Sequence, residues 1–118
     1  MAIYNYTRRQ AIADGILVDV SKMAEEAGFR FPVALTANAW NQYVKVPEDA
    51  KCQDEQGRLW DILNMLRFAI QEDGNRNELE FSLYVNNTGE PKLVLLKSIC
   101  GPGDTFEPVV TIMLPDEY

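Results

Sequence analysis

The sequence predicts an α+β fold, with three to four helices packed on a mainly antiparallel three- to four-stranded sheet in a single domain over residues 1–118. Three observations predict it. The chain is 47% hydrophobic, which at 118 residues suits one buried core. Residues 79–118 form three apolar runs joined by turn-forming residues at 86–91 and 101–104. Residues 55–73 carry apolar side chains at helical spacing. The short connections between the apolar runs favour an antiparallel meander.

The chain begins with two short elements. Thr7 and Gln10 have the spacing of a capping box, so a helix is expected to start there and to stop at Gly15. Residues 16–20 are rich in β-branched side chains, which predicts a short strand and a candidate fourth strand of the sheet.

Two more helices are expected before residue 45. Ser21 is the predicted cap of a helix that runs to Gly28. Residues 33–35 then read as a short extended segment, and Thr36 or Asn38 is expected to cap a third helix. Residues 45–56 are polar and indicate a loop.

The longest helix is predicted from Glu55 to Asp73, with Asp54 as its cap and Gly74 as its stop. Its core stripe consists of Leu59, Ile62, Leu63, Leu66, Ala69 and Ile70. Trp60, Met65 and Phe68 fall outside that stripe. A helix that is apolar on more than one side is expected to lie between the sheet and the N-terminal helices, or at a dimer contact.

The last third of the chain carries the clearest strand patterns. Residues 79–86 alternate apolar and polar side chains, which is typical of an edge strand with one buried face. Residues 93–96 and 109–114 are apolar on both faces, so these strands are expected nearer the middle of the sheet or beneath cover.

Composition excludes several kinds of catalytic site. The chain has no histidine, which removes Ser-His and Cys-His pairs and any zinc site that needs imidazole. Its two cysteines, Cys52 and Cys100, have no metal or redox spacing. We therefore expect no metal, no cofactor and a non-enzymatic role, although carboxylate or lysine chemistry stays open. No apolar run suits a membrane helix or a signal peptide, which predicts a cytoplasmic protein.

Charge is distributed unevenly along the chain. The first 46 residues hold five basic and four acidic residues, whereas the remainder holds six basic and fourteen acidic, so net charges of +1 and −8 make up the total of −7. Such acidity disfavours direct nucleic-acid binding. We expect a protein partner, with a nucleic-acid-handling complex as the sharper version and simple solubility as the alternative. The candidate partner-binding carboxylates are Glu78, Glu80, Glu90, Asp104, Glu107, Asp116 and Glu117.

Several blocks of the sequence together resemble a known family. They are Tyr6-Thr7-Arg8, residues 14–20, 26–29 and 32–36 with Trp40, residues 56–63, residues 100–104, and residues 107–115. In these the chain resembles a family of small uncharacterised bacterial proteins often found on plasmids, phages and other mobile elements. The resemblance supplies no catalytic residues. Its mobile-element setting implies roles such as countering host restriction or CRISPR defence.

The leading hypothesis is thus a non-enzymatic interaction protein, of which an acidic anti-defence inhibitor is the specific form. A second hypothesis is a small enzyme or small-ligand binder that uses carboxylates near the turn from Gly101 to Asp104. A third is an obligate homodimer of structural role. The chain is expected to be a monomer or a homodimer, without a membrane contact.

Overall fold

The computed structural model describes residues 6–46, 54–74, 76–87 and 89–117. Cys52 lies outside these residues. In chain order the elements are α1 (Arg8–Ala13), β1 (Leu17–Asp19), α2 (Ser21–Glu26), β2 (Val33–Thr36), α3 (Ala37–Ala39) continued by a π-helical segment (Trp40–Val44), α4 (Glu55–Asp73), β3 (Glu78–Asn86), β4 (Pro91–Pro102) and β5 (Pro108–Met113). Within the described residues, no helix is both long and apolar enough to cross a membrane.

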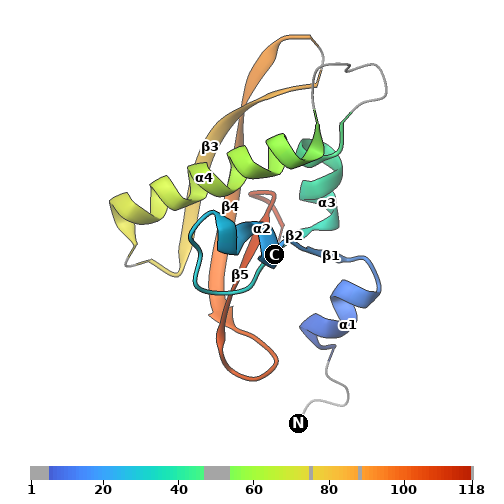
Figure 1. The fold of residues 1–118 in the computed structure, drawn as a ribbon, viewed down its shortest axis with the longest axis vertical. Coiled ribbons are helices and arrows are strands. Elements are labelled where there is room, and N and C mark those ends of the chain that lie inside the picture. Colours follow the sequence, from blue (N-terminus) through green and yellow to red (C-terminus); the bar gives the residue numbers. More distant parts are fainter. Residues whose placement is uncertain (1–5, 47–53, 75, 88, 118) are drawn as a thin grey trace.

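The sheet corrects the prediction of a mainly antiparallel sheet of three to four strands. It has five strands in the order β1-β2-β5-β4-β3 (Figure 1), and β2 runs parallel to β5. The remaining neighbours, including the meander of β3, β4 and β5, are antiparallel. The α+β class and four helices are as expected, but the strand count and the pairing were wrong.

The strand that changes the topology is β2. Its four residues are too few to show a period, so the sequence indicated only an extended segment. Val33, Ala34 and Leu35 are all fully buried, which suits a strand that lies between β1 and β5. A parallel pair needs a long connection, and α4 with the β3–β4 hairpin lies between β2 and β5 in the chain.

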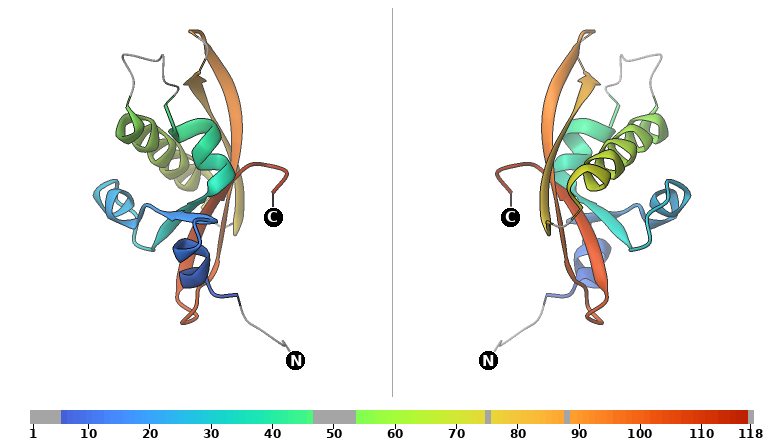
Figure 2. Two further views of the ribbon diagram at one scale, coloured as in Figure 1. Left: turned by 90° about the vertical axis from the view of Figure 1, so that its right-hand side faces the viewer. Right: turned by 90° about the vertical axis from the view of Figure 1, so that its left-hand side faces the viewer.

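The core lies between one face of the sheet and α4, with α2 on the same side (Figure 2). Phe81, Leu83 and Leu96 point from the sheet toward Leu63 and Leu66 of α4, and all five are buried. This arrangement confirms the predicted stripe of α4 except at Ile70, which is exposed. The predicted bounds of α4 and its Asp54 cap also agree with the structure.

The shorter helices have the caps predicted from the sequence, with one exception. Thr7 and Gln10 form the predicted capping box of α1, and Thr36 caps α3. Ser21 does not cap α2, because its Oγ donates to Asp19 Oδ1 at 2.6 Å and accepts the Val33 N–H at 3.1 Å. That hydroxyl therefore joins the start of α2 to β2.

Candidate functional site

Exposed apolar side chains gather on the part of the β3–β4 hairpin that extends beyond β5. Strand β5 pairs with β4 only from Lys97 onward, so the first half of β4 pairs with β3 alone (Figure 1). There Tyr84 lies opposite Leu93. Tyr84 is 69% exposed, Leu93 is 61% and Leu95 is 51%. These three side chains point away from the core and therefore lie on the uncovered face of the sheet.

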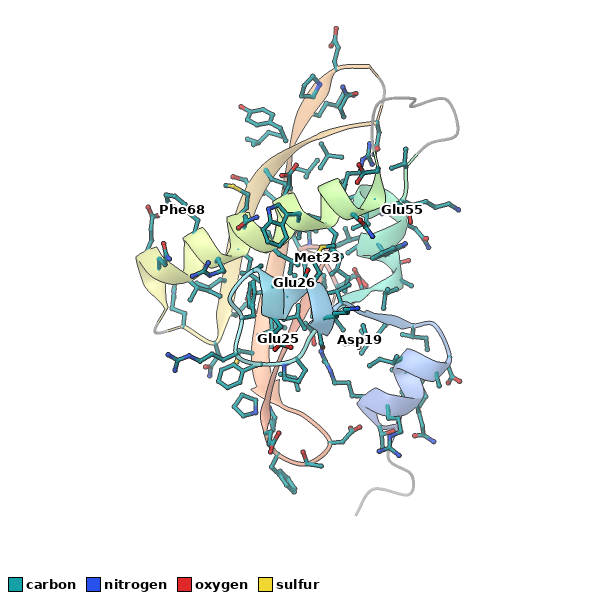
Figure 3. The ribbon with its side chains drawn as sticks, viewed as in Figure 1. Asp19, Met23, Glu25, Glu26, Glu55 and Phe68 are labelled. Atoms are coloured by element: carbon teal, nitrogen blue, oxygen red, sulfur yellow. The ribbon has the colours of Figure 1, made fainter. Side chains whose placement is uncertain are left out.

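Helix α4 adds two exposed apolar side chains beside the same hairpin. Met65 is exposed, and Phe68 is 58% exposed and projects from α4 into solvent (Figure 3). Both fall outside the buried stripe that holds Leu66. The helix was predicted to be buried on more than one side, but the described part of the chain leaves Met65 and Phe68 exposed.

Between these two groups runs the outer edge of β3, which has no neighbouring strand among the described residues. The N–H of Cys100 donates to the carbonyl oxygen of Asn77 at 2.8 Å, one step beyond the last pair of the β3–β4 register. Because bonded and non-bonded pairs alternate in an antiparallel ladder, the even-numbered residues of β3 direct their N–H and C=O groups away from β4. Glu80, Ser82 and Tyr84 therefore present backbone donors and acceptors outward.

A hollow of about 310 Å³ crosses this edge. It is lined by Asp61 and Met65 from α4, by Ser82 and Tyr84 from β3, and by Leu93 from β4. Its lining is mainly apolar. We call the surface made by Met65, Phe68, Tyr84, Leu93, Leu95 and the outer edge of β3 the β3-edge surface.

Carboxylates surround the N-terminal half of the same edge. A second hollow of about 400 Å³ is lined by Glu72, Arg76, Glu78 and Glu80, so three carboxylates face one guanidinium there. Asp61 adds a fourth carboxylate at the apolar hollow. The edge is consequently acidic at the start of β3 and apolar toward its end.

A comparison with protein families identifies the chain. Over residues 1–118 it matches the model of a family of unknown function, DUF6573. The chain belongs to this family. Neither the curated proteins nor the solved structures contain a match to it. The family assignment carries no activity with it, so the function must be argued from the geometry.

The predicted partner-binding carboxylates do not lie together in this DUF6573 protein. Glu78 and Glu80 flank the β3 edge, and Glu90 lies at the hairpin turn before β4. Asp104 and Glu107 lie in the loop between β4 and β5, at the opposite end of the long axis (Figure 1). The seven residues therefore form no single face, and their role in binding stays a prediction.

Two of these carboxylates hold the fold together. The Asp104 carboxylate accepts the N–H groups of Arg8 at 2.8 Å and Arg9 at 3.0 Å, and these hydrogen bonds hold the pKa of Asp104 below its usual value. Glu117 accepts from the Thr36 hydroxyl at 2.8 Å and from the Leu114 N–H at 2.9 Å. Asp116 is exposed in the segment after β5.

The turn near Gly101 offers little support for acid–base chemistry. A general acid at neutral pH needs a raised carboxyl pKa, whereas that of Asp104 is lowered. The hollow of about 390 Å³ beside it contains the guanidinium of Arg8, which donates to Thr111 Oγ1 at 2.7 Å and the Val110 carbonyl at 2.8 Å. Burial lowers the pKa of Arg8. Arg8 thus ties α1 to β5.

The sequence missed most of the β3-edge surface. Leu93 and Leu95 belong to a run that is apolar on both faces, which indicated burial. Tyr84 stood among the polar positions of an alternating strand. Only Met65 and Phe68, as apolar residues outside the helical stripe, gave a signal that something beyond the core contacts α4.

Proposed function

We propose that the protein is a non-enzymatic, cytoplasmic binding protein that acts by holding another protein at the β3-edge surface. The observation that carries this proposal is the gathering of Tyr84, Leu93 and Leu95 on the uncovered face with Phe68 on α4, all of them more than half exposed. Exposed aromatic, methionine and leucine side chains that gather on the two sides of one sheet edge are typical of protein-binding sites.

The negative charge of the chain supports the same proposal, but only through the carboxylates that lie beside β3. Glu72, Glu78 and Glu80 border the edge, whereas Glu90 and Glu107 lie far from one another. A cluster of carboxylates at the rim of an apolar surface attracts a basic partner and increases its rate of association. We therefore assign steering to the carboxylates at β3 and affinity to the apolar side chains.

The proposal extends to a biological setting. The resemblance to proteins of plasmids, phages and other mobile elements supports an anti-defence role, in which the chain inhibits a restriction- or CRISPR-type system. Complexes that handle nucleic acid present basic surfaces, which the carboxylates beside β3 would attract. On this proposal the protein contacts the complex and not the nucleic acid.

The experiment compares the proteins captured from bacterial extract by the wild type, by one double variant and by one single variant. Leu93→Ser with Leu95→Ser removes apolar surface at the hairpin, and Ile16→Ser removes a similarly exposed side chain elsewhere. We expect a captured protein that is lost with the first variant and kept with the second. Since screening weakens only the electrostatic part, capture should decline but persist from low to moderate salt. Equal capture by both variants would contradict the proposal.

A further inference from the structure

We infer that the β3-edge surface binds its partner by strand addition, with a basic, extended segment of the partner pairing with the outer edge of β3. This inference rests on the proposed function and specifies the partner's chemistry and its mode of binding. In recognition of this type, backbone hydrogen bonds add to the affinity of the side-chain contacts, and alternate side chains give specificity.

The first step is the availability of the backbone. Residues 78–86 form a strand of nine residues whose outer edge has no paired strand in the described part of the chain. Glu80, Ser82 and Tyr84 direct their N–H and C=O groups toward that edge. Long exposed edges are usually protected by proline, by bulges or by inward-pointing charges, because they pair readily with other strands. The described residues of β3 include no proline.

The second step is the fit of the side chains. A strand placed beside β3 would send alternate side chains to opposite faces of the sheet. On one face they would meet Met65 and Phe68 of α4, and on the other they would meet Tyr84 and Leu93. The hollow that spans α4, the β3 backbone and Leu93 lies along this path.

The third step is the charge of the occupant. Asp61, Glu72, Glu78 and Glu80 border the edge, Arg76 lies in the same hollow as three of them, and Lys97 of β4 lies opposite Glu80. A second copy of the chain would bring the same carboxylates and a further net charge of −7 to this edge. Complementarity instead favours a segment that carries lysine or arginine beside Glu78 and Glu80 and apolar residues beside Met65 and Tyr84.

One position separates strand addition from ordinary surface contact. Ser82 lies in the middle of β3, and its N–H points outward, so Ser82→Pro removes that donor and obstructs a neighbouring strand without breaking the β3–β4 ladder. Ser82→Thr keeps the N–H and favours the strand, which makes it the matched control. Glu78→Lys with Glu80→Lys tests the charge.

The probe is a library of short random peptides displayed on phage and selected on the immobilised wild-type protein. We expect the recovered peptides to carry lysine or arginine toward one end, beside Glu78 and Glu80, and apolar residues toward the other end. Their affinity should fall at least about tenfold with Ser82→Pro and with the double lysine variant, and should change little with Ser82→Thr. Recovery of acidic peptides, or of none, would overturn the inference.

Amide hydrogen exchange on the wild type gives a second readout that does not depend on a variant folding. In the free protein the odd-numbered amides of β3 are already bonded to β4, whereas those of Glu80, Ser82 and Tyr84 face solvent. A bound recovered peptide should slow exchange at the even-numbered amides alone. If none of them slows, strand addition is wrong.

The outcomes also separate this inference from the proposed function. If peptides or captured proteins bind equally to Ser82→Pro and Ser82→Thr but are lost with Leu93→Ser and Leu95→Ser, the surface is a binding site that does not use strand addition. If sedimentation shows a dimer that Ser82→Pro dissociates, the occupant is a second copy and the basic-segment inference is overturned.

Discussion

The Asp104 carboxylate joins the loop between β4 and β5 to the first turn of α1, since its two oxygens accept the N–H groups of Arg8 and Arg9. Asp104 and Arg8 are 96 positions apart in the chain. A carboxylate at a helix N-terminus satisfies amide groups that have no partner within the helix. The acidic loop that the sequence suggested as a binding site therefore holds the N-terminal helix.

The first prediction concerns the pH dependence of that contact. The folded-state pKa of Asp104 is lowered, so its contribution to stability is complete above the ordinary aspartate value of about 3.9 and is lost as pH falls through the lowered pKa. Asp104→Ala should lower the melting temperature at neutral pH and make little difference in strong acid. Glu107→Ala, in the same loop, is the control, and an equal loss with both variants would remove this role from Asp104.

The second prediction concerns Arg58, a buried residue of α4. Its guanidinium donates to the Lys45 carbonyl at 3.2 Å and to Asn87 Oδ1 at 2.7 Å, and it also donates to the Asn86 carbonyl. Arg58→Ala should reduce the free energy of unfolding by about 2–3 kcal/mol, because three part-buried oxygen acceptors lose a charged donor. Arg67→Ala, at an exposed position of the same helix, should cost within about 0.5 kcal/mol in the same urea titration.

The third prediction separates the two sides of α4. Leu66 is fully buried, whereas Phe68 is mostly exposed. Leu66→Ala should lower the free energy of unfolding by about 3 kcal/mol through lost burial and a cavity. Phe68→Ala should change it by less than about 0.5 kcal/mol. Denaturant unfolding measures both, and a large loss with Phe68→Ala would mean that this side chain serves the fold.

The fourth prediction concerns Phe106, which is 86% exposed and has a φ of 66°. Side chains other than glycine adopt such angles at a cost of about 1 kcal/mol. Phe106→Gly should therefore be more stable than Phe106→Ala by about that amount, since only glycine relieves the backbone. Thermal melts of the two variants give the comparison, and an alanine variant of equal stability would contradict it.

Much of the local structure could be predicted from the sequence because its causes are local. The Thr7–Gln10 capping box and the Asp54 cap are short-range hydrogen bonds, and Leu59, Leu63 and Leu66 recur at the period of a helix. The alternation along β3 likewise assigned Phe81 and Leu83 to the buried face. These features need no knowledge of the remaining chain.

The candidate site was less accessible to sequence reasoning. Leu93 and Leu95 resemble buried strand residues, and their exposure follows from the short pairing of β4 with β5, which begins only at Lys97. Asp104 resembles a free surface carboxylate, but its two amide donors come from the other end of the chain. Neither fact is encoded in a local pattern.

By itself the sequence determined the α+β class, the bounds of α4 and the buried face of β3, because side-chain period and helix caps act within a few residues. The tertiary structure decided the strand order and the parallel pairing of β2 with β5, whereas the position of β3 at the edge agrees with its alternating pattern. Strand order depends on hydrogen bonds between distant segments, and many orders are compatible with the same apolar pattern. The short pairing of β4 with β5, which leaves Leu93 and Leu95 exposed beside the edge of β3, arises at that level.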